Sequence, residues 1–361
     1  MRVLALTRYS PLGPSSRIRF YQYVPFLNSN GMEVLVAPLL GNDYVRNLYG
    51  GKRQPVFSVL RAYLSRIVYL VNSRQFDLLW IEKELLPWLP TRADYLLLRK
   101  GIPCIVDYDD AVFHRYDQHH NRLIRALLGK KIDIIMRRAT TVVVGNDYLA
   151  ERAYHAGARK IERLPSTVDI NRYAKKEKNG EQFCIGWIGS PITAPYLTMI
   201  KDALEEVMKQ TGARLVLVGS GDQDPLPGLA KEIFPWSEES EVAQIQSFDV
   251  GIMPLPDGPF EQGKCGYKLI QYMACGLPVI ASPVGFNTRI VEQGTTGYCA
   301  SNNNDWINAL VLLSKDSAIR VALGEAGRKK IEQKYSLQIT APRLLQIFTQ
   351  AASPHANGNV T

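Results

Sequence analysis

The segment Phe183-Cys184-Ile185-Gly186-Trp187-Ile188-Gly189 is apolar almost throughout and ends in glycine. This pattern predicts a strand that is buried on both faces of a parallel sheet. A helical pattern follows over residues 198–210, and a second apolar strand is predicted over residues 214–219. A strand, a helix and another strand in this order predict a right-handed parallel unit, the building block of a doubly wound α/β domain.

The same alternation continues on both sides of this unit. Further strands are predicted over residues 3–6, 33–37, 77–81, 103–108, 141–145, 249–254 and 278–281. The fold class is therefore α/β, with two Rossmann-like doubly wound parallel-sheet domains facing each other across a cleft. The predicted organisation is an N-terminal domain over residues 1–175, a C-terminal domain over 176–338 that begins with a polar linker, a terminal helix over 339–352 that packs back toward the N-terminal domain, and a disordered tail over 353–361.

The composition limits the class of protein. The chain has 361 residues, of which 46% are hydrophobic and 21% are charged, and this excludes a disordered or collagen-like chain. We expect a cytoplasmic protein, because no uncharged apolar run has the ~18 residues of a membrane span and the N-terminus lacks a signal-peptide core. The five cysteines form no Cys-x-x-Cys motif, which argues against both a disulfide framework and a structural zinc site.

Positive charge is concentrated in the first half of the chain. Residues 1–175 contain 27 Lys and Arg against 15 Asp and Glu, whereas the remaining residues contain 16 against 19. Two amphipathic helical patterns, over residues 59–74 and 121–138, carry much of this surplus. They predict either a peripheral site on the inner, anionic face of the cytoplasmic membrane or helices that simply pack on their own sheet. We do not predict a nucleic-acid partner, because aromatic residues do not alternate with these cations.

A glycine-rich loop leads into a helix within residues 257–282. Backbone N–H groups at the start of this helix, at Gly266 and Tyr267, predict an anion site, and Lys264 and Lys268 add positive charge to it. The chemistry favours a phosphate group as the ligand. The alternative is a packed loop with two solvated lysines.

The end of the same segment resembles a known family. Tyr272-Met273-Ala274-Cys275, followed by Gly276-Leu277-Pro278-Val279-Ile280-Ala281-Ser282, is similar to the signature of the retaining GT-B glycosyltransferases of family 4, the glycosyl transferases group 1 clan. The resemblance extends over most of residues 183–335. It implies the metal-independent transfer of a sugar, with retention of configuration, from a nucleotide-diphosphate sugar to a glycan or lipid-linked acceptor, in cell-surface polysaccharide synthesis. No cofactor is expected beyond this donor substrate. The alternatives are a catalytically degenerate nucleotide-sugar-binding protein and a GT-B epimerase.

The chain departs from the family pattern at its charged positions. The family carries two glutamates eight residues apart; Gln271 stands at the second position and Gly263 at the first. Gln271 still offers an amide to the donor ribose, and Glu261 is a candidate substitute for the missing carboxylate. The family's Arg and Lys after the first strand of this domain are absent as well. We therefore predict that Lys264 and Lys268 neutralise the leaving diphosphate.

Other donor-binding candidates follow the first two strands of the C-terminal domain. They are Gly189 and Ser190 after one strand and Gly219 and Ser220 after the next, where glycine allows close approach of the backbone to a ligand. Trp236 is placed where similar enzymes contact the base. A core position is the alternative for this tryptophan.

The N-terminal domain supplies the acceptor-side candidates. Gly13 begins a loop that resembles the family's glycine loop, and Arg17 and Arg19 are predicted to contact phosphate. Asp109 and Asp110 follow a strand end, and either could accept a hydrogen bond from a sugar hydroxyl. Helix capping is the alternative for these aspartates and for the serines that precede Arg17. No metal site is predicted, because this cluster lacks enough ligands.

Overall fold

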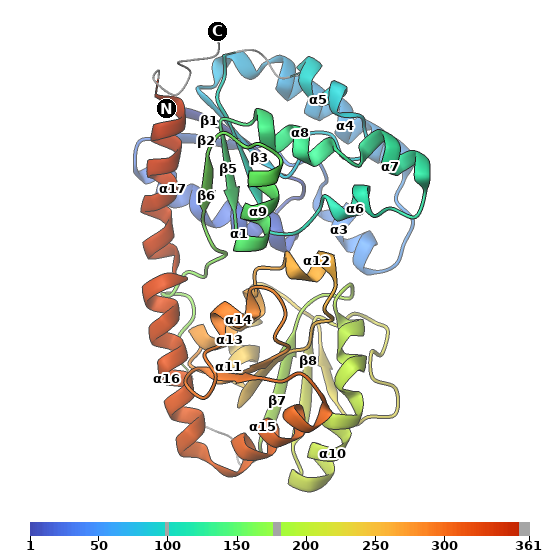
Figure 1. The fold of residues 1–361 in the computed structure, drawn as a ribbon, viewed down its shortest axis with the longest axis vertical. Helices are drawn as coiled ribbons and strands as arrows, with labels where there is room; N and C mark the ends of the chain where they lie inside the picture. Colours follow the sequence, from blue (N-terminus) through green and yellow to red (C-terminus); the bar gives the residue numbers. More distant parts are fainter. Residues whose placement is uncertain (98–100, 176–181, 354–361) are drawn as a thin grey trace. The chain divides into compact units, whose positions relative to one another are not determined.

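The structure is a computed structural model that describes residues 1–97, 101–175 and 182–353. The chain forms two compact units (Figure 1). Unit 1 contains Met1–Ser166, Gln262–Cys265 and the C-terminal residues from Thr340; unit 2 contains Thr167–Glu261 and Gly266–Ile339. The predicted boundary at residue 175 therefore lies inside unit 2, and a four-residue segment of the glycine-rich loop belongs to unit 1. Residues 176–181 of the predicted linker over 175–181, and residues 354–361 of the predicted tail over 353–361, lie outside the described residues.

Unit 1 is built on a parallel sheet with the strand order β2-β1-β3-β4-β5-β6. The strand that begins the chain, β1, pairs with β2 on one side and with β3 on the other, so the order reverses at the boundary between β1 and β3. The six strands are β1 (Arg2–Leu6), β2 (Glu33–Val36), β3 (Leu78–Glu82), β4 (Cys104–Tyr108), β5 (Thr141–Val144) and β6 (Ile161–Arg163).

Helices connect these strands. They are α1 (Pro14–Arg19), α2 (Val24–Ser29), α3 (Asn42–Tyr49), α4 (Val56–Val71), α5 (Thr91–Leu97), α6 (His114–Asp117), α7 (Arg122–Leu128), α8 (Lys131–Arg138) and α9 (Asp147–His155), with 3-10 turns at Tyr21–Tyr23 and Ser73–Gln75. The last helix, α17 (Leu337–Ala352), joins the core of unit 1: Phe348 packs edge-on against Trp80 of β3, with ring centroids 5.0 Å apart.

Unit 2 has a parallel sheet with the order β12-β11-β10-β7-β8-β9. Its strand order reverses between β7 and β10. The strands are β7 (Cys184–Ile188), β8 (Arg214–Val218), β9 (Glu232–Phe234), β10 (Val250–Met253), β11 (Val279–Ala281) and β12 (Gly297–Cys299). The helices are α10 (Lys201–Thr211), α11 (Glu241–Gln246), α12 (Pro259–Gln262), α13 (Tyr267–Ala274), α14 (Asn287–Ile290), α15 (Asn303–Lys315) and α16 (Ser317–Lys334), with a 3-10 helix at Ala194–Ile200.

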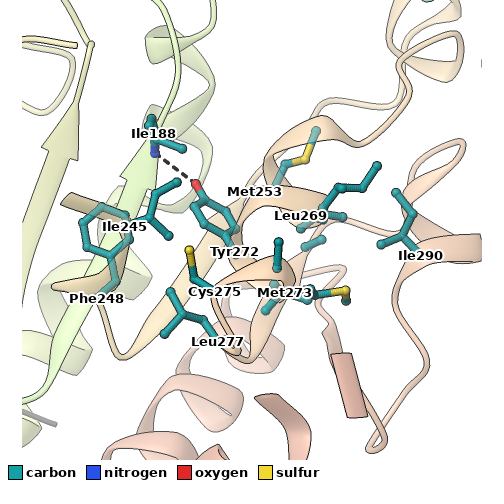
Figure 2. Close-up of a cluster of buried hydrophobic side chains, with 14 of the residues drawn as sticks. Ile188, Ile245, Phe248, Met253, Leu269, Tyr272, Met273, Cys275, Leu277 and Ile290 are labelled. Atoms are coloured by element: carbon teal, nitrogen blue, oxygen red, sulfur yellow. Dashed lines mark hydrogen bonds between the residues drawn. The ribbon is translucent and has the colours of Figure 1, made fainter. Parts of the chain in front are cut away.

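The packing of α13 fixes its place in unit 2. Leu269, Tyr272 and Met273 lie in a buried cluster (Figure 2), and the Tyr272 hydroxyl accepts a hydrogen bond of 2.9 Å from the backbone N–H of Ile188 at the end of β7. A Cβ on Gly251 of β10 would lie 2.2 Å from the Tyr272 ring, so this strand position requires glycine. The start of α13 is thereby held next to the carboxyl end of β7.

The predicted α/β class with two Rossmann-like doubly wound parallel sheets is confirmed. In a sheet of this kind, ligands bind at the carboxyl ends of the strands next to the reversal of strand order. In unit 2 that place is the end of β7, and in unit 1 it is the ends of β1 and β3. The arrangement of the two domains across a cleft stays a prediction.

Candidate functional site

The carboxyl ends of β7 and β8 approach each other closely in unit 2. Gly189 follows β7, and Gly219 follows β8 with a positive φ of 74°. A Cβ on Gly219 would lie 2.6 Å from the carbonyl oxygen of Gly189 and 2.9 Å from Cβ of Trp236. Both the backbone conformation and this contact require glycine at residue 219. The result is a backbone-lined edge that includes four of the predicted donor residues, Gly189, Ser190, Gly219 and Ser220.

Lys268 lies over this edge. It is the second residue of α13, and its Nζ is 5.3 Å from the centre of the Trp187 ring and 3.4 Å from Oγ1 of Thr193. A Cβ on Gly189 would lie 2.9 Å from Cε of Lys268, so the lysine side chain passes directly along the loop after β7. The helix begins after Gly266, which has a positive φ of 63°, and no side chain of the described residues caps it. A cation and a helix N-terminus therefore meet at one strand end.

The hydroxyl of Ser220 is a buried polar group in the same place. The residue is 2% exposed, and its Oγ has no hydrogen-bond partner among the parts of the chain that the structure describes. A buried hydroxyl without a partner costs free energy, on the order of 1–3 kcal/mol. A ligand that accepted or donated a hydrogen bond at this strand end would remove that cost.

The predicted ribose-binding residue, Gln271, forms a hydrogen bond within unit 2. Gln271 is 4% exposed, and its amide donates to the hydroxyl of Tyr173 at 2.9 Å. Tyr173 donates in turn to Glu241, which also accepts from the indole N–H of Trp236 at 2.8 Å. Burial and the nearby Glu241 raise the pKa of Tyr173 well above its usual value. These contacts hold Trp236, which is half-buried against the core, next to Gly219. Gln271 supports Trp236 indirectly, through Tyr173 and Glu241.

Two further candidates, Glu261 and Tyr267, contact other residues of unit 2. Glu261, proposed as the substitute for the missing glutamate, accepts a hydrogen bond of 2.6 Å from the hydroxyl of Tyr196. Tyr267, at the first position of α13, is half-buried against the core. Both roles stay predictions.

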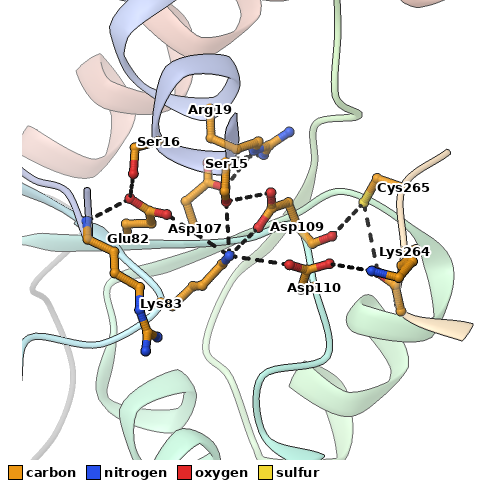
Figure 3. Close-up of polar contacts among 12 residues, drawn as sticks. Ser15, Ser16, Arg19, Glu82, Lys83, Asp107, Asp109, Asp110, Lys264 and Cys265 are labelled. Atoms are coloured by element: carbon orange, nitrogen blue, oxygen red, sulfur yellow. Dashed lines mark hydrogen bonds and ion pairs between the residues drawn. The ribbon is translucent and has the colours of Figure 1, made fainter. Parts of the chain in front are cut away.

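A second cluster of polar residues lies at the carboxyl ends of β3 and β4 in unit 1 (Figure 3). Lys83 is at its centre: Nζ is 2.7 Å from Oδ1 of Asp109, 3.6 Å from Oδ2 of Asp110 and 2.9 Å from Oγ of Ser15. Ser15 donates to the other oxygen of Asp109 at 2.6 Å. Lys83 is 4% exposed, and its backbone has a positive φ of 64°, which is rare for a residue other than glycine.

These contacts set the charges of the cluster. Burial lowers the pKa of Lys83. The nearby carboxylates of Asp109, Asp110 and Glu82 raise it by a larger amount, so the pKa of Lys83 lies above its usual value. Burial raises the pKa of Asp110, yet Lys264 and Lys83 outweigh it and hold that pKa below its usual value. At neutral pH Asp110 is therefore an ionised carboxylate that can accept, but cannot donate, a hydrogen bond.

The structure gives Arg19 partners other than the phosphate that the sequence predicted. Its guanidinium is 1% exposed and forms two hydrogen bonds to Asp107, of 2.7 and 3.0 Å. A third bond, of 2.7 Å, goes to the carbonyl of Leu164. Burial raises the pKa of Asp107 to about 6, although Arg19 opposes the shift. Since Arg19 is enclosed, it positions β4 instead of contacting a solvent-borne ligand.

The glycine loop also differs in detail from its prediction. Gly13 precedes α1, and a Cβ there would lie 2.4 Å from Cβ of Tyr9. Arg17 donates to the carbonyl of Pro11 at 3.1 Å. The predicted serine cap of α1 is wrong, because the serine hydroxyls bind strand-end carboxylates: Ser16 donates to Glu82 at 2.6 Å, as Ser15 does to Asp109.

Segment 262–265 is attached to this polar cluster. The amide of Asn146 donates to the carbonyls of Gly263 and Lys264, at 2.9 and 3.1 Å, and the thiol of Cys265 contacts the carbonyl of Asp109 at 3.2 Å. Nζ of Lys264 lies 3.9 Å from Asp110. A Cβ on Gly263 would lie 2.5 Å from Cβ of Ala111. The glutamate that the family carries here cannot fit in this arrangement, and this contact is a physical reason for glycine.

The two predicted phosphate lysines therefore lie in different units. Lys268 is grouped with Gly189, Ser190, Gly219 and Trp236 in unit 2, whereas Lys264 pairs with Asp110 in unit 1. The sequence predicts Lys83 at a strand end that could line an acceptor groove, but not its central position. It also predicts a helix cap at Asn146, which is confirmed because Asn146 accepts from the N–H of Leu149 in α9. The bonds of Asn146 to Gly263 and Lys264 were not predicted. The sequence did contain a signal for Lys83, which stands between two glutamates directly after a buried strand.

Comparison with known proteins gives matches for both the sequence and the fold. Residues 182–316 match the family model Glycosyl transferases group 1. A GDP-mannose-dependent monoacylated alpha-(1-6)-phosphatidylinositol monomannoside mannosyltransferase of Corynebacterium glutamicum is 25% identical over 212 residues, which are 52% of this chain and 56% of that protein. The chain thus spans little more than half the length of this curated relative.

Solved structures match nearly the whole chain. Sucrose-phosphate synthase of Thermosynechococcus elongatus has a TM-score of 0.73 at 16% identity, covering 98% of this chain and 100% of that one. HepE of Anabaena, solved in complex with UDP and glucose, has a TM-score of 0.72 at 15% identity, covering 97% and 100%. Identities this low show the fold alone, and they confirm the predicted GT-B architecture.

Proposed function

We propose that this chain is a glycosyltransferase that transfers a sugar from a nucleotide-diphosphate sugar to a glycan or lipid-linked acceptor. The observation that carries the proposal is the carboxyl edge of the sheet in unit 2, where Lys268, the start of α13 and two glycine-lined loops converge. The family match over residues 182–316 covers all of these residues.

The chemistry of sugar transfer explains why this edge carries a cation. When the anomeric bond of the donor breaks, negative charge grows on the diphosphate that leaves. Fixed cations and backbone N–H groups stabilise this charge in the transition state more than in the ground state. We assign that role to Lys268 and to the N-terminus of α13.

The remaining donor contacts follow from the same edge. Gly189 and Gly219 allow a diphosphate to approach the backbone, and Ser220 offers its buried hydroxyl. We place the nucleoside next to Trp236, which Glu241 holds beside Gly219. HepE was solved with UDP and glucose, which supports a sugar nucleotide as the ligand class.

We assign the acceptor side to the polar cluster of unit 1. Asp110 is ionised and a quarter exposed, so it can accept a hydrogen bond from a sugar hydroxyl. Asp109 is more enclosed, and Lys83 and Ser15 hold it in place. The proposal includes retention of configuration, independence from metal ions, a cytoplasmic location and a role in cell-surface polysaccharide synthesis.

A screen of UDP-, GDP- and ADP-sugars for donor hydrolysis and transfer tests the proposal. We expect one donor class to be consumed at the same rate with and without EDTA, and Lys268→Met to lower kcat/KM by about tenfold or more, since a charged hydrogen bond contributes about 1.5–3 kcal/mol. The matched control is Lys209→Met, which removes an exposed lysine of α10. Donor binding without hydrolysis or transfer would instead indicate a nucleotide-sugar-binding protein. A change of sugar configuration without transfer would indicate an epimerase.

A further inference from the structure

Helix α4 exposes an apolar side to solvent, which is unusual for a surface helix. Only Arg66 and Leu70 are buried along its sixteen residues. The guanidinium of Arg66 donates to the carbonyls of Thr7 and Ala37, the residues that directly follow β1 and β2. The inward side of α4 therefore contains Leu70, which is fully buried, and an arginine that donates to backbone carbonyls just after two strands of the sheet.

The outward side of α4 is apolar. Phe57, Leu60, Leu64, Val68 and Val71 follow one another at helical spacing, so they form one stripe along the helix. Each of the five is between 47% and 78% exposed. We call these five residues the α4 stripe. Exposed aliphatic residues in unit 2, such as Val321 on α16, do not form a comparable row.

The segment that carries the stripe has charges of one sign only. Residues 44–76 contain six Lys and Arg and no Asp or Glu. Lys52, Arg53, Arg61 and Arg74 are exposed before, beside and after the stripe. A second basic segment, residues 118–132, also lacks acidic residues and presents Leu123 and Leu127 of α7, each 71% exposed.

We propose that the α4 stripe is a docking surface for an anionic lipid bilayer. Aliphatic and aromatic side chains enter the boundary between headgroups and acyl chains, and the surrounding cations contact lipid phosphates. The uniform positive charge argues against a second copy of the chain, because two such faces would repel each other. In the described part of the chain, no helix is long and apolar enough to cross a membrane. The inference is independent of the proposed transfer reaction and concerns where the protein is held.

Vesicle flotation with the full chain tests this inference. We expect binding to vesicles of phosphatidylcholine with phosphatidylglycerol, little binding to phosphatidylcholine alone, and weaker binding at high salt. The double variant Leu60→Asp/Leu64→Asp should lower the bound fraction at least tenfold. Its matched control, Val321→Asp, changes an equally exposed aliphatic residue in unit 2 and should bind like the unaltered protein.

The other outcomes overturn the proposal. Absence of flotation with anionic vesicles contradicts it directly, and so does binding that the double variant leaves unchanged. If sedimentation shows a dimer that the double variant dissociates, the stripe is a contact between copies instead. Circular dichroism verifies that the variants are folded. Donor hydrolysis in detergent-free buffer, measured on the same variants, should be unaltered, so that a failure of membrane docking is distinguishable from a failure of the proposed activity.

Discussion

The two strand-end clusters use opposite means to arrange polar groups. In unit 1, charged side chains pair with one another: Lys83 with Asp109 and Asp110, and Arg19 with Asp107. Most of the charge is therefore neutralised within the protein. In unit 2, the edge after β7 and β8 is lined by glycine backbone, one lysine and a buried hydroxyl without a described partner. The first arrangement positions carboxylates rigidly. The second leaves the hydroxyl of Ser220 without a partner in the described part of the chain.

The largest expected effect comes from removing the central cation of unit 1. Lys83→Met leaves Asp109 and Asp110 without their shared partner in an enclosed site, and it should destabilise the protein by about 3–5 kcal/mol. Urea unfolding measures the difference. Lys52→Met, at an exposed position, is the control and should change stability by less than about 0.5 kcal/mol. Equal stability of the two variants would show that the ion pairs of Lys83 contribute nothing.

The edge of unit 2 is also sensitive to added volume. Gly219→Ala places a Cβ 2.6 Å from the carbonyl of Gly189. Gly212→Ala is a matched control, because Gly212 has a similar positive φ of 66° but open space around it. Both variants carry the backbone strain, of about 1–2 kcal/mol. Gly219→Ala should cost a further ~1–3 kcal/mol from overpacking and should abolish binding of the donor nucleotide. Similar stability and binding in the two variants would contradict the close approach.

Restoring the family's glutamate should loosen segment 262–265. In Gly263→Glu the new side chain would overlap Ala111, so we expect Cys265, 6% exposed, to be alkylated about tenfold faster, equivalent to ~1.4 kcal/mol. Mass spectrometry of the Cys265 peptide measures this rate. Gly41→Glu, where nothing lies within 4 Å of the added Cβ, should leave the rate unchanged. An unchanged rate in Gly263→Glu, or a gain in transferase activity, would contradict this explanation of the missing glutamate.

The smallest effect concerns the pH dependence of Asp110. Its pKa is lowered in the folded state, so the unfolded state binds a proton first as the pH falls. The contribution of Asp110 to stability is therefore present above its ordinary pKa, about 3.9, and is lost as the pH falls below that value. Asp110→Asn should flatten the acid limb of a plot of unfolding free energy against pH by about 1 kcal/mol or less. A variant with the same acid limb as the unaltered protein would show that the lysines do not affect Asp110.

The sequence predicted the framework of both clusters because strand ends can be located from apolar runs. Gly189, Gly219, Asp109 and Asp110 all follow such runs, and parallel strands bring their ends to one edge. Partners across the sheet could not be predicted in this way. Neither the bond between Arg19 and Asp107 nor the attachment of Gly263 to Asn146 has a sequence spacing that reveals it.

The orientation of α4 was equally hidden. The sequence pattern does not tell which of its apolar residues face outward. The exposure of the α4 stripe and the contacts of Arg66 with the carbonyls of Thr7 and Ala37 show the orientation. The central position of Lys83 was hidden for a similar reason. A lysine after a strand usually extends into solvent, whereas a positive φ turns this one into the cluster.

Titration of the donor nucleotide tests the central claim most directly. Calorimetry should compare the unaltered protein, Lys268→Met and Lys209→Met, using the nucleoside diphosphate of whichever donor the screen identifies. We predict that Lys268→Met weakens binding by about tenfold or more while Lys209→Met binds like the unaltered protein. Unchanged affinity and unchanged turnover in Lys268→Met would contradict the assignment of the diphosphate to the edge of unit 2.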